Sequence, residues 1–340
     1  MTSQTPDISA LSLDAICANT ASLSGDILRT PCLTLDTGLM ARVLGGGAAV
    51  FKLECFQHTG TFKARGALSV ARSLDVDQLA RGITAASAGN HAIAAAWAAR
   101  QVGASAKVVI QSNANPFRVA LAKAEGAEVI MKAPGAETFG EAERLVREEG
   151  RYFIHPFEGL LTSMGTAGVG LELMEDAPDL DAVVVSIGGG GLVSGIAAAV
   201  KQFNPHCKVY GVEPVGAAGM HRSMATGAPV RLEQVDTIAD SLGAPMALPF
   251  GHALCAAYLD DIVLLEDDDI CAGMVAFQQE AKLAVEPAAG AALAAVMGPL
   301  RARLQGKRVG IIVCGANIDA QTYIRLMARG QGAFEALTKI

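Results

Sequence analysis

The sequence predicts an α/β protein in which parallel or mostly parallel β-sheets are covered by helices. Short apolar runs alternate along the chain with stretches of helical character, which is typical of parallel strands connected by helices. Hydrophobic residues make up 51% of the 340 residues but aromatic residues only 5%, so we expect a core of small aliphatic side chains. The 37 glycines indicate many turns and close backbone contacts. This composition excludes a disordered chain, a collagen and a coiled coil.

The expected strands and helices follow one another in a regular order. The apolar runs that predict strands lie at residues 50–53, 82–86, 107–110, 128–132, 152–154, 181–187, 208–212, 262–265 and 308–313. The expected helices lie at residues 91–102, 116–125, 137–149 and 193–203. At about 100–200 residues per domain, the chain forms one large domain or two of modest size. A run of strand–helix units at about residues 80–150 suggests a smaller lobe.

The charges and cysteines predict a cytoplasmic protein that binds neither nucleic acid nor a membrane. The 27 basic and 34 acidic residues give a net charge of −7, and no basic cluster marks a nucleic-acid surface. The seven cysteines are odd in number and form no CxxC pair, which is typical of reduced thiols. The N-terminal residues lack the features of a signal peptide. The most apolar stretch, residues 283–300, is too short and too interrupted to span a bilayer.

Four consecutive glycines, Gly188 to Gly191, connect the strongly apolar run at 181–187 to a predicted helix. Because these residues lack side chains, their N–H groups can converge on one anion at the positive end of the helix dipole. A flexible turn is the alternative, although four glycines lose much backbone entropy on folding. The motif has neither the Gly-Lys-Ser/Thr of a P-loop nor the spacing of the dinucleotide motif GxGxxG. It predicts a phosphate-binding site.

Three further motifs place reactive side chains at turns. Lys63 follows a Gly-Thr turn within residues 58–67, and taken alone it is typical of a surface lysine at a helix start. Residues 87–92, Ser-Ala-Gly-Asn-His-Ala, either offer N–H groups and hydroxyls to a carboxylate or form an ordinary helix cap. Cys314 begins Cys-Gly-Ala-Asn after the last strand, where ligands lie in doubly wound sheets, or it is a packed core thiol.

In this order the four motifs resemble one family. They look like the motifs of the pyridoxal-phosphate enzymes of fold type II, the tryptophan synthase β type. The motifs are Thr-Phe-Lys-Ala-Arg-Gly-Ala at 61–67, the motif at 87–92, the tetraglycine with Leu192, and Cys-Gly-Ala-Asn at 314–317. Within it they are similar to the serine/threonine dehydratase and serine racemase branch. The resemblance implies a large cofactor-binding domain of residues 1–76 and 153–340. It also implies a small mobile domain of residues 77–152, with the cofactor in the cleft between the two.

The resemblance implies a set of cofactor ligands. Lys63 would form a Schiff base with pyridoxal phosphate, and Phe62 would pack against its ring. Asn90 would hydrogen-bond the ring hydroxyl, Cys314 would face the pyridine nitrogen, and Glu286 matches a glutamate close to the cofactor. The phosphate would be bound by Gly188, Gly189, Gly190, Gly191 and Leu192. The substrate carboxylate would be held by Ser87, Ala88, Asn90 and His91.

The implied reaction is β-elimination of water from a β-hydroxy amino acid, with L-threonine or L-serine as the expected substrate. The cofactor withdraws electrons, and the freed amine of Lys63 takes the Cα proton. A thiol at Cys314 does not protonate the ring nitrogen strongly, so loss of the β-hydroxyl is favoured over transamination. The products are a 2-oxo acid and ammonia. Because relatives are usually dimers or tetramers, we expect a homodimer.

Departures from the family pattern leave several details open. Racemases of this branch carry a serine where this chain has Ala88, which has no proton to give, so we expect dehydration without efficient racemisation. Metal-activated members carry an acidic residue at the position of Gly219, so a site for Mg or Ca is either lost or uses other ligands, with Glu213 as a candidate. Residues 162–166 and Ser241 also depart from the common pattern. The alternative substrates are therefore 3-hydroxyaspartate, phenylserine or a diamino acid.

Three other functions are weighed against dehydration. A serine racemase-like activity is opposed by Ala88, and β-replacement by the motif around Lys63, since cysteine synthase relatives carry a different lysine motif. A non-enzymatic binding protein is opposed by the joint presence of Lys63, Asn90, the tetraglycine and Cys314. Four other histidines show no metal-ligand spacing and are expected to be structural or on the surface. They are His155, His206, His221 and His252.

Overall fold

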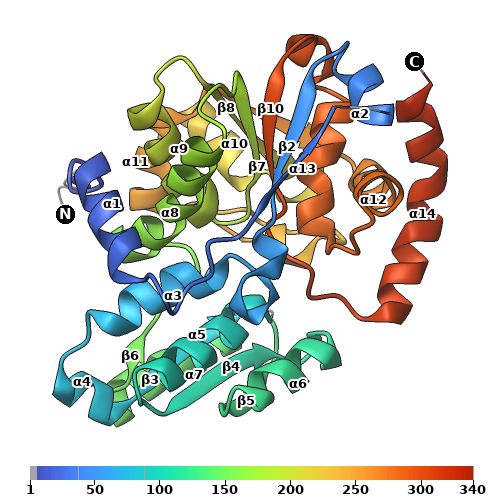
Figure 1. Cartoon of the computed structure of the whole chain (residues 1–340). Helices are drawn as coiled ribbons and strands as arrows, with labels where there is room; N and C mark the ends of the chain where they lie inside the picture. Colours follow the sequence, from blue (N-terminus) through green and yellow to red (C-terminus); the bar gives the residue numbers. More distant parts are fainter. Residues whose placement is uncertain (1–5, 37, 88, 340) are drawn as a thin grey trace.

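The computed structural model describes residues 6–36, 38–87 and 89–339, and it contains two β-sheets (Figure 1). The larger sheet has six strands in the order β1 (Cys32–Leu35), β2 (Ala48–Lys52), β10 (Arg308–Ile312), β7 (Ala182–Ser186), β8 (Lys208–Pro214) and β9 (Asp261–Leu265). Strand β1 is antiparallel to β2, and the other neighbours are parallel. The prediction of mostly parallel sheets covered by helices is confirmed.

The second sheet has four parallel strands in the order β5 (Glu128–Lys132), β4 (Ala106–Gln111), β3 (Ile83–Ser87) and β6 (Tyr152–Phe153). In Figure 1 it lies below the six-stranded sheet. These strands fall within or at the edge of residues 77–152, the segment expected to form the smaller lobe. The domain boundaries and the mobility of that lobe stay predictions.

Helices cover both sheets. Around the larger sheet, α8 (Leu160–Asp176), α9 (Gly191–Phe203) and α11 (Pro249–Tyr258) lie on one side, and α12 (Asp267–Ala276), α13 (Pro287–Met297) and α14 (Ala320–Thr338) lie on the other (Figure 1). The smaller sheet is packed by α5 (Asn90–Gln101), α6 (Pro116–Ala124) and α7 (Ala136–Glu149). The remaining helices are α1 (Leu13–Ser22), α2 (Gly38–Val43), α3 (Lys63–Arg72), α4 (Val76–Arg81) and α10 (Gly219–Thr226). No helix in the described ranges has the length and apolarity needed to cross a membrane.

Helix α3 joins the two halves of the fold. It packs against α8 on the side of the larger sheet and against α5 on the side of the smaller one. Its first residue is Lys63, and the turn before it is attached to the larger sheet by a β-bridge between Thr61 and Gly315, just beyond β10. The lysine motif is therefore fixed between the carboxyl ends of strands from both sheets, where ligands lie in α/β folds.

Candidate active site

One pocket lies where the two sheets meet, with an empty volume of about 1000 Å³ including its opening to solvent. It brings together residues that are far apart in the chain. The predicted site residues that line it are Phe62, Lys63, Ser87, Asn90, His91, Gly188, Gly189, Gly190, Gly191, Leu192, Glu286 and Cys314. Ala88, predicted to bind substrate, lies outside the described residues.

Lys63 is directed into this pocket. Its Nζ donates a hydrogen bond to the carbonyl oxygen of Pro156 at 2.9 Å and lies 4.8 Å from the centre of the Phe62 ring. Burial of the amine lowers its pKa to about 8, although the nearby Cys314 and Glu286 act in the opposite direction. A much larger fraction of the amine is therefore neutral at physiological pH than for an ordinary lysine, and a neutral amine is a nucleophile and a base.

The four glycines form the turn between β7 and α9. None of the backbone N–H groups from Gly188 to Leu192 meets a hydrogen-bond acceptor among the described residues. Side chains would not fit here, because a Cβ on Gly191 would lie 2.6 Å from the carbonyl oxygen of Phe157 and one on Gly189 would strike the Phe157 ring. Unpaired N–H groups at the N-terminus of a helix form a site for an anion such as phosphate.

The second turn connects β3 to α5 and carries Ser87, Asn90 and His91. Ser87 Oγ accepts a hydrogen bond from the N–H of Gly89 at 2.9 Å. His91 lies buried with its Nε2 2.8 Å from the carbonyl oxygen of Ile154, so this nitrogen carries the proton and donates it. Burial, with a further contribution from Lys63, lowers the pKa of His91 to about 3. The ring is therefore neutral at physiological pH.

Glu286 is a buried carboxylate at the start of α13. Asn90 Nδ2 donates to its two oxygens at 3.0 and 2.9 Å, and Arg118 Nη2 lies 3.3 Å from Oε2. Burial raises the pKa of Glu286, whereas the guanidinium of Arg118 and the amide of Asn90 act to lower it. These contacts compensate in part for the desolvation of the carboxylate.

Cys314 follows the end of β10, and its carbonyl oxygen accepts a hydrogen bond from the N–H of Phe62 at 3.1 Å. Burial raises the pKa of the thiol well above its ordinary value, and the negative charge of Glu286 raises it further. The side chain is therefore a neutral thiol in the pocket rather than a thiolate.

Glu213 lies apart from this pocket, at the end of β8. Its oxygens accept hydrogen bonds from the N–H groups of Met220 at 2.8 Å and His221 at 2.7 Å, at the start of α10. Burial raises the pKa of this carboxyl to about 7. In the described portion of the chain, no three His, Cys, Asp or Glu side chains gather as a metal site. The contacts of Glu213 are those of a side chain that holds a helix end.

Two pocket residues, Arg118 and Phe139, carry no motif and were missed in the sequence, whereas Phe157 lies in the His-Pro-Phe segment at 155–157 that resembles a dehydratase motif. Arg118 on α6 is buried, and its Nη1 forms an ion pair with Asp240 at 2.5 Å. Phe139 on α7 and Phe157 add aromatic surface to the pocket wall. The sequence identified residues 116–125 only as a helix, because the burial of Arg118 arises from packing between the two halves of the fold. His155 fits its expected structural role, since its Nδ1 accepts from the N–H groups of Phe157 and Glu158.

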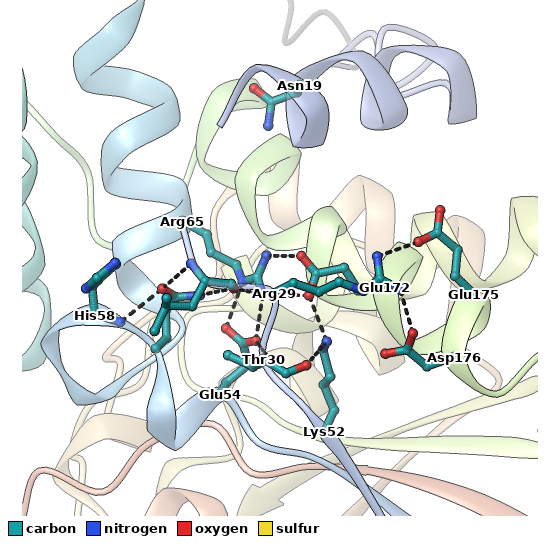
Figure 2. Close-up of polar contacts among 12 residues, drawn as sticks. Asn19, Arg29, Thr30, Lys52, Glu54, His58, Arg65, Glu172, Glu175 and Asp176 are labelled. Carbon is teal, nitrogen blue, oxygen red and sulfur yellow. Dashed lines mark hydrogen bonds and ion pairs between the residues drawn. The ribbon is translucent and has the colours of Figure 1, made fainter. Parts of the chain in front are cut away.

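A buried ion network lies behind the lysine motif (Figure 2). Arg65 is in α3, two residues after Lys63, and forms ion pairs with Glu54 and Glu172. Lys52 Nζ lies 2.7 Å from Glu172 Oε2. Two cations and two anions thus compensate one another, and the network connects the start of α3 to β2 and α8.

Fold and pocket together define a two-lobed α/β enzyme in which a half-buried lysine and a glycine turn line the same pocket. A family model described as "Pyridoxal-phosphate dependent enzyme" matches residues 23–315, and the chain belongs to this family. Phenylserine dehydratase of Ralstonia pickettii is 49% identical over 285 residues, which cover 84% of this chain and 87% of that protein. L-threonine ammonia-lyase of Thermotoga maritima is 35% identical over 286 residues, which cover 84% and 71%. The solved structure of maize serine racemase has a TM-score of 0.86 at 34% identity and covers 94% of this chain and 98% of that one.

The residues of the pocket fit pyridoxal phosphate, the cofactor of this family. The unpaired N–H groups from Gly188 to Leu192 can donate hydrogen bonds to the phosphate of the cofactor. The neutral fraction of the Lys63 amine can react with its aldehyde. The two sites line the same pocket. Unpaired N–H groups that suit a phosphate and an amine that suits an aldehyde, lining one cavity, meet the two attachments that this cofactor requires.

Proposed function

We propose that the protein is a pyridoxal-phosphate dependent ammonia-lyase that removes water from a β-hydroxy amino acid and releases a 2-oxo acid and ammonia. The observation that carries the proposal is the half-buried Lys63 amine of lowered pKa, held in one pocket with the glycine turn and the neutral thiol of Cys314. Phenylserine dehydratase and L-threonine ammonia-lyase, two similar proteins, are dehydrating or ammonia-releasing enzymes by name.

Each pocket residue has a proposed part in binding. Lys63 would hold the aldehyde carbon of the cofactor, and the N–H groups from Gly188 to Leu192 its phosphate. Phe62 would pack against the ring, Asn90 would bind the ring hydroxyl, and Cys314 would face the ring nitrogen. Glu286 would lie close to the cofactor and orient Asn90. The carboxylate of the substrate would be held by Ser87, Ala88, Asn90 and His91.

The chemistry follows from the protonation states in the pocket. When bound, the cofactor supplies an electron sink for the substrate Cα. The Lys63 amine takes the proton from Cα, and the bond from Cβ to the hydroxyl oxygen breaks, so that water is lost overall. The neutral thiol of Cys314 leaves the ring nitrogen without a strong proton donor, which favours elimination. The released enamine tautomerises and is hydrolysed to the 2-oxo acid and ammonia.

The pocket favours a β-hydroxy amino acid with an uncharged, aromatic side chain. An acidic side chain such as that of 3-hydroxyaspartate would need an unpaired cation. The guanidinium of Arg118, however, is already paired with Asp240 and Glu286. Phe139 and Phe157 provide the aromatic surface that a phenyl group would contact. We therefore place phenylserine ahead of L-threonine and L-serine as substrate.

Three further expectations belong to the same proposal. The part of the chain at residues 77–152 would move on substrate binding and close the turn with Asn90 over the substrate carboxylate. The protein would act as a homodimer. It would work in the cytoplasm, in keeping with seven cysteines that are free within the described ranges.

A screen of substrates tests the proposed function. The purified protein, loaded with pyridoxal phosphate, is given phenylserine, L-threonine, L-serine and 3-hydroxyaspartate, and release of 2-oxo acid and ammonia is measured. We expect product from phenylserine at the highest kcat/KM, and none from the Lys63→Ala variant, which should also lose the yellow colour of the bound cofactor. Rapid conversion of L-serine to D-serine, or incorporation of added sulfide without release of 2-oxo acid, would replace dehydration by racemisation or β-replacement.

A further inference from the structure

Four buried residues form a closed ring of hydrogen bonds at the wall of the pocket, and the ring includes the main-chain carbonyl of Asn317. Arg118 Nη2 contacts Glu286 at 3.3 Å, and Glu286 accepts from Asn90 Nδ2 at 2.9 Å. Asn90 Oδ1 accepts from Asn317 Nδ2 at 3.0 Å, and the carbonyl oxygen of Asn317 accepts from Arg118 Nε at 2.8 Å. Each of the four residues has between 2% and 6% of its surface exposed. Arg118 and Asn90 belong to helices of the smaller sheet, whereas Glu286 and Asn317 belong to the larger half.

Asn317 is a member of this ring that the proposed function does not use. It closes the Cys-Gly-Ala-Asn motif, and its Nδ2 also donates to the carbonyl oxygen of Thr59 at 2.7 Å. The turn around Thr59 is shaped to receive it, because Thr59 has a φ of 67° and a Cβ on Gly60 would strike Asn317 Oδ1. A positive φ in a residue other than glycine is unfavourable and is kept only where the surroundings hold it.

The acceptors around the ring determine how both amides are oriented. The carbonyl oxygen of Thr59 cannot donate a hydrogen bond, so the group of Asn317 that faces it must be the NH₂. The second hydrogen of that NH₂ is then directed to Asn90, so the atom of Asn90 that accepts it must be the oxygen Oδ1. The NH₂ of Asn90 consequently faces Glu286, whose carboxylate can only accept while it is ionised. The backbone of the turn before Lys63 thus determines, through Asn317, which atom of Asn90 points where.

We propose that Asn317 is a positioning residue that fixes the amide of Asn90 in the one orientation able to bind the cofactor ring. The inference rests on the proposed role of Asn90 and assigns to Asn317 no contact with cofactor or substrate. A reversed or freely turning Asn90 amide would present the wrong atom to the ring hydroxyl. We call the chain of hydrogen bonds from the Thr59 carbonyl through Asn317 to Asn90 the relay. Cofactor binding then requires this relay rather than the volume of the Asn317 side chain.

The variant Asn317→Asp keeps the size of the side chain but replaces the NH₂ by an oxygen. That oxygen would face two acceptors, the carbonyl of Thr59 and Asn90 Oδ1, and the relay would fail. The matched control is Asn204→Asp, because Asn204 lies half-buried after α9, away from the pocket, and its side chain uses its Oδ1, which accepts from the N–H of His206 at 3.1 Å. The variant Asn317→Ala removes the relay without adding a repelling oxygen.

The measurement is the dissociation constant of pyridoxal phosphate from the cofactor-free protein, together with the melting temperature of each variant. We expect Asn317→Asp to weaken binding by about 10- to 100-fold, as for loss of a hydrogen bond involving a charged group, and Asn317→Ala by less. Asn204→Asp should change the affinity less than about twofold. A residue that acts only through its packing would give the opposite order, with alanine the more damaging change, and this order would overturn the proposal.

A double-mutant cycle asks whether Asn317 acts through Asn90. Asn90→Ala alone should weaken cofactor binding, and adding Asn317→Asp to it should cause no further loss beyond about twofold. An unchanged penalty of Asn317→Asp in the Asn90→Ala background would refute the relay, as would an Asn90→Ala protein with wild-type affinity. Because binding is measured and not turnover, a failure of the proposed dehydration would not alter the reading of this cycle.

Discussion

Arg65 and Glu172 are joined by two parallel hydrogen bonds in the core of the protein. Arg65 Nη1 lies 2.7 Å from Glu172 Oε1, and Nη2 lies 2.8 Å from Oε2, although 107 residues separate the two in the chain (Figure 2). Arg65 also donates to both oxygens of Glu54. A planar guanidinium can satisfy two carboxylates at once in this way, whereas an ammonium group cannot.

We therefore expect Arg65→Met to destabilise the protein strongly. It leaves the carboxylates of Glu54 and Glu172 buried with Lys52 as their one remaining cation in the network, and removal of one partner from a buried ion pair costs about 3–5 kcal/mol. The matched control is Arg144→Met, which removes partly exposed pairs with Glu141 and Glu148 within α7 and should cost less than about 1 kcal/mol. Urea unfolding of the cofactor-free proteins measures both values. Equal losses for the two variants would show that the network contributes no more than a surface pair.

Gly191→Ala should weaken cofactor binding by at least about tenfold. The new methyl group would lie 2.6 Å from the carbonyl oxygen of Phe157, and a backbone atom cannot move aside as a side-chain end can. The turn must then shift and misplace its N–H groups. Gly140→Ala in α7 is the control, because nothing lies within 4 Å of its Cβ position and alanine is the better helix former. Titration of both apo-proteins with pyridoxal phosphate gives the comparison, and equal affinities would contradict a phosphate site at Gly191.

The stability of the cofactor-free protein should depend on pH through Lys63. Its pKa is about 8 in the folded protein and about 10.5 when unfolded, so between these values the unfolded chain binds the additional proton. Stability contributed by this site therefore rises from pH 8 to 10.5, and the burial penalty is complete below pH 8. We expect Lys63→Met to stabilise the apo-protein at pH 7 by about 2 kcal/mol, and the gain should shrink toward pH 10.5. Denaturant unfolding at pH 7, 9 and 10.5 measures it; a gain that is constant with pH would mean that the amine is not desolvated.

Phe139→Ala should lower kcat/KM for phenylserine more than for L-threonine, by about tenfold or more. A phenyl group loses an aromatic partner worth about 0.5–1.5 kcal/mol as well as buried area, whereas the methyl group of threonine loses little. Phe203→Ala serves as the control because this side chain is exposed at the end of α9. A parallel loss for both substrates would assign Phe139 to the packing of α7 instead of to selectivity.

The sequence supported the fold class and the family, and it missed several helices, including α14, and the edge strand β1. The strand predicted at residues 128–132 coincides with β5, and the apolar run at 181–187 contains β7. Helices α8 and α13 were not predicted, because they are buried on nearly all sides and so show no alternation of polar and apolar faces. Strand β1 was also missed, since its four residues carry a mixed pattern at the sheet edge.

The sequence also predicted most of the motif residues of the candidate site, but not their partners from other parts of the chain. Twelve predicted residues line one pocket, because each belongs to a motif at the end of a strand or the start of a helix. Their chemical roles stay predictions. Arg118 carries no local signal, since only the packing of α6 against the larger half makes it a buried partner of Glu286 and Asp240. The hydrogen bonds between Asn90 and Asn317 likewise depend on distances that a sequence does not contain.

Strand β10 lies between β2 and β7, so the middle of the larger sheet is completed by residues that are synthesised long after β2 and well after β7. The four strands of the smaller sheet are all contained in residues 83–153 and can pair during synthesis. The strands β2 and β7, by contrast, each keep an open edge until residues 308–312 arrive. A chain that ends early therefore loses the centre of its sheet, not a border, and exposes two apolar strand edges that favour aggregation. For this protein, a chain released before β10 is synthesised should therefore be prone to aggregation.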